Sequence, residues 1–319
     1  MLDILAVTSP IYVTILIGFI ATRSGWFDKA AMRSFGAFVI KLALPALIFN
    51  ALAKRQIGEI LNLSYLAAYA GGSLALVAVA YLCCRRLAGL GRSASAIYAM
   101  GMTVSNSGFI GYPILLLTLA PVAGVALALN VIIENALVLP LLLALAERGG
   151  GDGGGPWHRL VARSLAQLAR NPIVIGTAAG LAVSMLGFTL PAPAERTVGM
   201  FALSSNALSL FVIGGTLVGL PIGGLARRAM PVMLAKLIGH PLAVLGAGLA
   251  VPLIGLAPLD PMLFMAAVLL AAMPMASIYP ILSQAYGHED FSATALVITI
   301  VTSFFTFTGL LWVMHRLTL

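Results

Sequence analysis

The most constraining feature of this sequence is a succession of apolar stretches, each about as long as a bilayer is thick. A helix needs about 20 mostly apolar residues to cross the hydrocarbon core of a membrane. Only 9% of the residues are charged and 61% are hydrophobic, whereas roughly a quarter of a soluble domain is charged. A surface with so few charges must face lipid. The sequence therefore predicts an all-α integral membrane protein with ten transmembrane helices, near residues 4–22, 34–53, 64–84, 95–119, 122–146, 172–190, 197–220, 231–254, 262–286 and 291–314.

The first apolar stretch has the length of a secretory signal peptide. Residues 1–19 have Asp3 as their only charge, and no basic residue precedes Arg23. A signal peptide starts with a positively charged region and ends at a small-residue cleavage site before a soluble domain. Neither feature is present, so we interpret this stretch as the first transmembrane helix.

Basic residues predict the orientation of the chain. The formal net charge is +8, but no run of Lys or Arg exceeds two residues, and no basic patch with interleaved aromatic residues suggests a nucleic-acid partner. Cytoplasmic loops of membrane proteins are enriched in Lys and Arg. With both termini outside, the cytoplasmic loops hold twelve basic residues and the outer loops hold four. We therefore predict that both termini lie outside.

A glycine-rich segment divides the chain. Residues 147–158 read ERGGGDGGGPWH and predict a flexible cytoplasmic linker, followed at 159–170 by an amphipathic helix on the membrane surface. The segment 147–171 separates a first half, 1–146, from a second half, 172–319. Five spans on each side is an odd number, so the halves cross the membrane in opposite directions and form an inverted repeat if they share a fold.

A shift of 167 residues supports this repeat. It lays each span of the first half on its counterpart in the second half without gaps. It also superimposes the tetrapeptide YPIL at 112–115 on the same tetrapeptide at 279–282. The domains predicted are therefore two inverted five-helix repeats joined by the linker.

Polar residues, glycines and a proline interrupt the fourth span. Pro113 cannot donate the hydrogen bond of a continuous helix, and unsatisfied backbone is tolerated in a membrane only where it lines a protein cavity. We expect the helix to unwind near residues 108–112 and Pro113 to begin a second half-helix, whose N–H groups and dipole favour an anion. The candidate substrate-binding residues here are Asn106, Ser107, Gly108, Gly111 and Pro113.

The ninth span repeats this pattern with Pro274, Ser277 and Pro280. Interrupted helices at matched places in two halves indicate the binding site of a transporter. The alternative is a pair of proline kinks that only shape helix packing, because Gly and Pro are frequent in membrane helices. We add these three residues to the predicted substrate site.

Charged side chains within the spans are the second indication of function. Glu134, next to Asn135, is the acidic residue deep in a span, and such residues are functional candidates by default. Glu134 either titrates and couples proton movement to transport, or forms a structural ion pair with Lys41 or Lys236. Lys41 either extends to the membrane interface or faces the substrate. Lys236 and His240, one turn apart, form either a cationic face towards a carboxylate or a packing contact.

Four stretches resemble the auxin efflux carrier family of membrane transporters, in its bacterial branch. They are LPALIF at 44–49, NSGFIGYP at 106–113, RNPIV at 170–174, and residues 273–280 followed by AYG at 285–287. The resemblance covers essentially the whole chain. It implies a ten-helix fold of two inverted repeats, in which broken helices 4 and 9 cross at a central site and a transport half moves against a scaffold half as an elevator.

The resemblance also implies a function. Substrates would be small organic anions: auxin-like acids in plant members, malate or malonate in some bacterial ones. The crossover asparagine and proline of the family correspond to Asn106 and Pro113, and its ninth-span prolines to Pro274 and Pro280. The long cytosolic loop of plant carriers is replaced by the short linker, so regulation through that loop is not expected. The location would be the bacterial inner membrane, and a homodimer would fit the family.

Two other functions compete with organic-anion transport. A sodium-coupled symporter or a cation/proton antiporter can share such a fold, but an antiporter would be expected to have buried acidic residues at the crossover, and none lies within 95–119 or 262–286. Sodium or protons remain possible coupling ions. A membrane enzyme would need a catalytic set, and neither HExxH nor GxSxG occurs. We expect no enzyme activity, cofactor or metal site.

Overall fold

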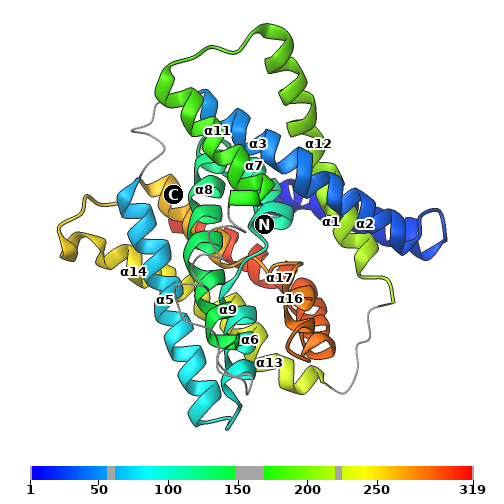
Figure 1. The fold of residues 1–319 in the computed structure, drawn as a ribbon, viewed down its shortest axis with the longest axis vertical. Coiled ribbons are helices and arrows are strands. Elements are labelled where there is room, and N and C mark those ends of the chain that lie inside the picture. Colours follow the sequence, from blue (N-terminus) through cyan, green and yellow to red (C-terminus); the bar gives the residue numbers. More distant parts are fainter. Residues whose placement is uncertain (1, 56–61, 148–168, 220–224, 318–319) are drawn as a thin grey trace. The chain divides into compact units, whose positions relative to one another are not determined.

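The computed structural model describes residues 2–55, 62–147, 169–219 and 225–317, and secondary structure within these ranges is helical apart from one isolated β-bridge. Figure 1 shows the helices in chain order. The α-helices are α1 (Leu2–Arg23), α2 (Lys29–Phe38), α3 (Leu44–Ala53), α5 (Leu63–Arg86), α6 (Arg92–Thr103), α7 (Tyr112–Thr118), α8 (Ala120–Ile133), α9 (Leu139–Glu147), α11 (Pro172–Leu186), α12 (Ala192–Thr216), α13 (Ala226–Leu234), α14 (His240–Ala250), α15 (Pro261–Ala271), α16 (Tyr279–Gln284) and α17 (Glu289–Leu317). A short 3₁₀ turn, η5 (Val251–Ile254), follows α14.

These helices coincide with the predicted apolar ranges. Among the described residues, six helical stretches are long and apolar enough to cross a membrane: Lys29–Ala53, Leu63–Arg86, Ala120–Glu147, Ala192–Thr216, Ala226–Ile254 and Glu289–Val313. Shorter apolar helices occupy the remaining predicted ranges. The all-helical fold with several candidate membrane spans is therefore confirmed, while the total of ten spans and the inverted repeat stay predictions.

Several of these helices contain a π-helical turn shortly before a proline. Four π-helical turns occur in the described ranges: η1 (Val39–Ala43), η2 (Ser107–Gly111), η3 (Glu134–Val138) and η4 (Ala235–Gly239). Each runs directly into an α-helix whose second residue is proline, namely Pro45, Pro113, Pro140 or Pro241. Proline lacks the N–H of the regular ladder and its ring clashes with the carbonyl four residues earlier. A wider turn before the proline relieves this clash and keeps the helix continuous.

The fourth apolar segment is interrupted at a different place from the one we predicted. α6 ends at Thr103, the backbone at Val104 is extended, and helix resumes at Ser107. The predicted unwinding at residues 108–112 is wrong, because these residues continue through η2 into α7. The π turn accommodates Pro113 without unwinding, and the break at residues 104–106 lies seven to nine residues before it. Pro113 is the second residue of α7 rather than the first of a half-helix.

The ninth segment is interrupted where the prolines predicted. α15 ends at Ala271 and α16 begins at Tyr279. Pro274 lies in the non-helical segment between them, and Pro280 is the second residue of α16, a position where the missing N–H costs nothing.

The chain divides into two units. Unit 1 comprises Met1–Asn62, Ser107–Val131 and Ala169–Gly219. In it α1 packs along α12, and α3 packs along α11. The backbones of α1 and α12 approach so closely that a Cβ on Gly214 would lie 1.8 Å from the carbonyl oxygen of Ile15. Small residues at helix contacts allow such approach in membranes.

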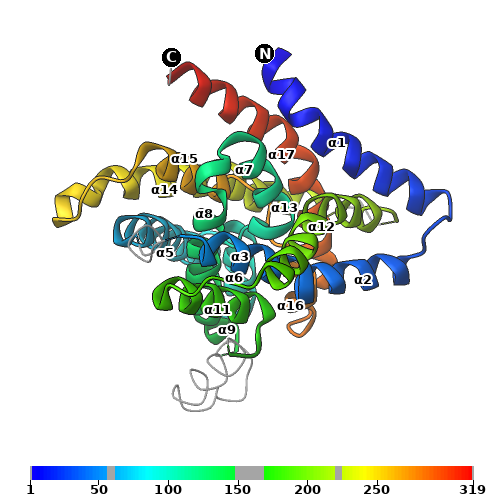
Figure 2. The same ribbon diagram turned by 90° about the horizontal axis from the view of Figure 1, so that it is seen from above.

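Unit 2 comprises Leu63–Asn106, Ile132–Leu168 and Leu220–Leu319. In it α5 packs along α14, α6 contacts α9, and α17 contacts α13 and α16. Figure 2 shows these helices from above. A Cβ on Gly72 would lie 2.6 Å from the Cα of Val244, so α5 and α14 also meet backbone to backbone.

The two units do not follow the two halves of the sequence, because each unit draws segments from both halves. The units group residues by their contacts, whereas the predicted halves are two copies of a repeat. The predicted division at 147–171 therefore stays a prediction. The predicted linker and surface helix lie almost wholly outside the described residues.

Candidate functional site

In unit 2 the two interrupted segments pair with each other. Ser105 and Met275 form an isolated antiparallel bridge. Its hydrogen bonds run from Asn106 N to Pro274 O at 2.8 Å and from Ala276 N to Val104 O at 3.1 Å. A backbone that leaves a helix inside a membrane protein must satisfy its polar groups elsewhere. Here the backbone polar groups of each interrupted segment form hydrogen bonds with those of the other.

Asn106 extends this pairing to side chains. Its Nδ2 donates to the Ser277 hydroxyl over 2.7 Å, and its side chain is 4% exposed. Both residues were predicted for the substrate site from sequence, and the structure brings them together. Amide and hydroxyl groups on non-helical backbone are the kind of polar set that orients a small ligand.

Lys236 is a fully buried base beside this pairing. It lies in η4 with an exposed fraction of 0%. Its Nζ is 2.7 Å from Ser105 Oγ, 2.9 Å from His240 Nδ1 and 2.8 Å from Ala271 O. An ammonium group has three N–H donors, and these three contacts use all of them. Ala271 ends the half-helix α15, so the ammonium lies at the negative end of a helix dipole.

His240 connects Lys236 to α5 through a further hydrogen bond. Its Nε2 is 2.9 Å from Ser73 Oγ, and its side chain is fully buried. When Lys236 is an ammonium, His240 Nδ1 must accept and Nε2 must carry the hydrogen that bonds Ser73. The predicted pair of Lys236 and His240 is thus a direct hydrogen bond within a longer chain of contacts.

Glu134 is a buried acid that contacts Ser105, the serine that Lys236 also contacts. Its Oε1 accepts the backbone N–H of Ser105 at 2.9 Å and the Tyr69 hydroxyl at 3.1 Å. The Tyr69 hydroxyl also lies 3.2 Å from Ser105 Oγ. Glu134 is 5% exposed, and a buried carboxylate is stable when it accepts such bonds. Ser105 therefore contacts a buried base through its hydroxyl and a buried acid through its amide.

Unit 1 contains the other part of the fourth segment. Asn130 Nδ2 donates to Ser107 Oγ at 2.5 Å, and both side chains are buried. In the described part of the chain, Asn130 Oδ1 has no hydrogen-bond partner. An unpaired buried acceptor is costly, so it indicates a place for a donor or a cation. The predicted residues Gly108, Gly111 and Pro113 continue this helix.

Two predicted charge candidates are not among these contacts. Lys41 lies in η1 of unit 1 with an exposed side chain, which is compatible with extension to the membrane interface. Asn135 follows Glu134 in η3 with a half-buried side chain. Pro280 is half-buried at the start of α16.

Sequence reasoning missed four contributors to these contacts: Tyr69, Ser73, Ser105 and Asn130. For two of them a signal existed. A shift of 167 residues carries Tyr69 onto Lys236 and Ser73 onto His240, so matching the polar positions of the third span to those of the eighth would have identified them. Tyrosine and serine are common enough in membrane helices that neither stands out alone.

Comparison with known proteins identifies the family. The family model described as "Membrane transport protein" matches residues 4–153 and 157–313. The chain belongs to this family. The match confirms the resemblance to auxin efflux carriers, and it makes the protein a multi-pass membrane transporter of a small-molecule substrate.

Individual family members are also similar. A protein of Rhizobium meliloti (strain 1021), named "Putative malonate transporter", is 29% identical over 318 residues, 99% of this chain and 97% of the relative. "Uncharacterized transporter YfdV" of Escherichia coli (strain K12) is 26% identical over 256 residues, 76% of this chain and 77% of the relative.

Proposed function

We propose that this protein is a secondary active transporter of small organic anions, with carboxylates such as malonate or malate as substrates. The observation that carries the proposal is the mutual pairing of two interrupted segments in unit 2, with Asn106 bonded to Ser277 and the buried Lys236 on the adjoining serine. Interrupted helices with polar side chains and a buried base suit a carboxylate in a membrane protein. The name of the Rhizobium relative supports malonate as the first substrate to test.

The proposed mechanism is elevator-type alternating access by two inverted repeats. Helix pairings within the units support it. Under the 167-residue shift, the pairing of α1 with α12 in unit 1 corresponds to that of α11 with α3. In unit 2 the pairings of α5 with α6 and of α6 with α9 correspond to those of α14 with α15 and of α15 with α17.

Direct contact between equivalent positions also supports the repeat. Ser73 and His240 are 167 residues apart and hydrogen-bonded. In a structure with pseudo-twofold symmetry, a residue meets its own counterpart only near the symmetry axis. The same proposal includes the bacterial inner membrane as location, both termini outside, and a homodimer as assembly.

A proton is the coupling ion we propose, with Glu134 as the group that carries it. Glu134 shares Ser105 with Lys236, so a change of charge on the acid alters the environment of the base. The remaining proposed residues have supporting roles. Ser107, Gly108, Gly111 and Pro113 shape the helix that resumes after the first break. Pro274 and Pro280 define the second break, and His240 and Asn135 neighbour the charged pair.

Cation/proton antiport is the second candidate, and one observation favours it. The sequence ranges of the two interrupted spans contain no acid, but Glu134 reaches the crossover from η3 through Ser105. A buried acid at such a site is what an antiporter requires, and Glu134 is a candidate for it. Sodium-coupled symport would draw on the same oxygen-rich groups.

Uptake into proteoliposomes tests these alternatives. The purified protein is reconstituted, and uptake of radiolabelled malonate and malate is followed with an inward proton gradient, an inward sodium gradient, or neither. We expect saturable carboxylate uptake that a proton gradient stimulates. Sodium or proton flux in the absence of any carboxylate, with no carboxylate uptake, would overturn the proposal in favour of antiport.

A further inference from the structure

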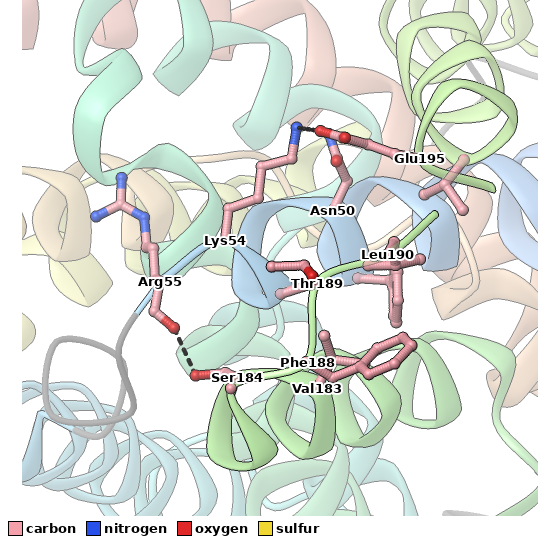
Figure 3. A pocket seen from close by; sticks show the side chains of 13 residues that line it. Asn50, Lys54, Arg55, Val183, Ser184, Phe188, Thr189, Leu190 and Glu195 are labelled. Atoms are coloured by element: carbon pink, nitrogen blue, oxygen red, sulfur yellow. Dashed lines mark hydrogen bonds and ion pairs between the residues drawn. The ribbon is translucent and has the colours of Figure 1, made fainter. Parts of the chain in front are cut away.

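Unit 1 contains two adjoining cavities at the end of α3. One has a volume of about 460 Å³ and the other about 500 Å³. Both are lined by Asn50, Lys54 and Arg55. Figure 3 shows the first, with Lys54 extending beside Asn50 towards Glu195. None of these residues belongs to the substrate site proposed above.

The second cavity is rich in hydrogen-bond donors. Its described lining is Asn50, Ala51, Lys54, Arg55, Tyr112, Ala120 and Gly124. Among these residues none is acidic, and the ammonium, guanidinium, amide and phenol groups are all donors. Basic residues are favourable here for a structural reason, because Lys54 is the C-cap of α3 and the end of a helix attracts positive charge. The lining is suited to a small anion.

The position of Arg55 is held from two sides. Its carbonyl accepts the Ser184 hydroxyl at 2.5 Å, which ties the backbone to α11. Its guanidinium donates to the carbonyl of Pro121 at the start of α8. A guanidinium has five N–H donors in a fixed planar geometry, and the bond to Pro121 orients the group. An oriented guanidinium binds a carboxylate more selectively than a mobile one.

Lys54 already holds a carboxylate. Its Nζ lies 2.7 Å from Oε1 of Glu195 in the first turn of α12, and the two side chains are 55% and 47% exposed. Exposed ion pairs contribute little to stability, so a competing anion can displace Glu195. The pair shows how a carboxylate binds to Lys54. Because both side chains are exposed, replacing Glu195 by another carboxylate requires little free energy.

We propose that the cavity of about 500 Å³ in unit 1 is a second binding site for small carboxylates. Arg55 and Lys54 supply the positive charge, Asn50 and Tyr112 supply neutral donors, and Glu195 competes with the ligand for Lys54. The proposal goes beyond the function proposed above, since it holds whether or not the crossover residues bind substrate. Small-molecule pockets in proteins have volumes of roughly 300–1,000 Å³, so this cavity is large enough for a dicarboxylate.

Equilibrium binding of radiolabelled malonate to the purified full-length protein in nanodiscs tests the proposal, with sulfate as a competing dianion. We expect two malonate sites on the unmodified protein and one on Asn106→Ala. Adding Arg55→Gln to Asn106→Ala should weaken the remaining site by about tenfold or more. Adding Glu195→Gln instead should tighten it, because Lys54 is then released.

Matched variants separate the outcomes. Arg33→Gln removes one exposed positive charge of unit 1 that lines neither cavity, so it should leave both affinities unchanged. Lys54→Gln should weaken the second site as Arg55→Gln does, and it serves if Arg55→Gln fails to give monodisperse protein. One malonate site that Asn106→Ala removes completely would overturn the cavity proposal while leaving the crossover intact. A single site that Arg55→Gln weakens and Asn106→Ala does not would support the cavity and refute the crossover.

Discussion

Lys236 Nζ lies 2.7 Å from Ser105 Oγ, and the backbone N–H of the same serine is bonded to Glu134. A single residue in the interrupted part of the fourth apolar segment thus connects a buried base with a buried acid. The base comes from η4 and the acid from η3, both of which are π turns created ahead of a proline. π turns are frequent at functional sites because they change the direction in which side chains point.

The first prediction concerns substrate binding. Asn106→Ala removes the amide that bonds Ser277 Oγ, and we expect kcat/KM for malonate uptake to fall about tenfold or more, the cost of a lost polar contact in a buried site. Initial uptake rates into proteoliposomes measure this. Ser34→Ala, at an exposed serine of α2, is the matched control. Equal rates for Asn106→Ala and the control would remove Asn106 from the site.

The second prediction concerns coupling. Glu134→Gln keeps an oxygen that accepts from Tyr69 and Ser105 but cannot bind and release a proton. We expect uptake driven by a proton gradient to be lost, while exchange of internal for external malonate continues. Both are measured in the same proteoliposomes. Gradient-driven uptake at the unmodified rate in Glu134→Gln would contradict a coupling role.

The third prediction concerns stability. Lys236→Met removes the donor that bonds Ser105 and Ala271 and leaves a buried acid nearby, so we expect a loss of roughly 3 kcal/mol or more in unfolding free energy. Glu134→Gln in the Lys236→Met protein should restore part of this loss, because the isolated charge is then removed. Thermal denaturation in detergent of both single variants and the double variant gives the coupling energy. Additive effects would show that the two residues act independently.

The fourth prediction concerns the contact of α5 with α14. A Cβ at Gly72 would lie 2.6 Å from Val244 Cα, whereas a Cβ at the adjacent Gly71 would meet only the Ala247 side chain at 3.8 Å. We expect Gly72→Ala to destabilise the protein by about 1–3 kcal/mol through overpacking. Gly71→Ala should be neutral or slightly stabilising, since Ala is the better helix former. The two melting temperatures in one detergent decide it, and equal values would refute the close contact.

Proline and hydrophobicity determined much of this protein at the level of sequence. The length of the apolar stretches located the helices, because only helices satisfy their backbone within lipid. Pro274 and Pro280 correctly located the ninth break, since Pro274 lacks the N–H that a continuous helix needs and lies between α15 and α16. Some of the polar residues of the site were predicted from sequence. Of these, Asn106 contacts Ser277 and Lys236 contacts His240.

Only the tertiary structure decided the rest. Pro113 predicted a break next to itself, but a π turn absorbed the proline and moved the break to residues 104–106. Tyr69 and Ser73 became important because α5 packs on α14, a contact that hydropathy does not encode. Glu134 reached Ser105 across 29 positions of chain. The physical reason is common to these cases: sequence determines which segments leave water, whereas which polar groups satisfy one another inside depends on helix packing that brings distant residues together.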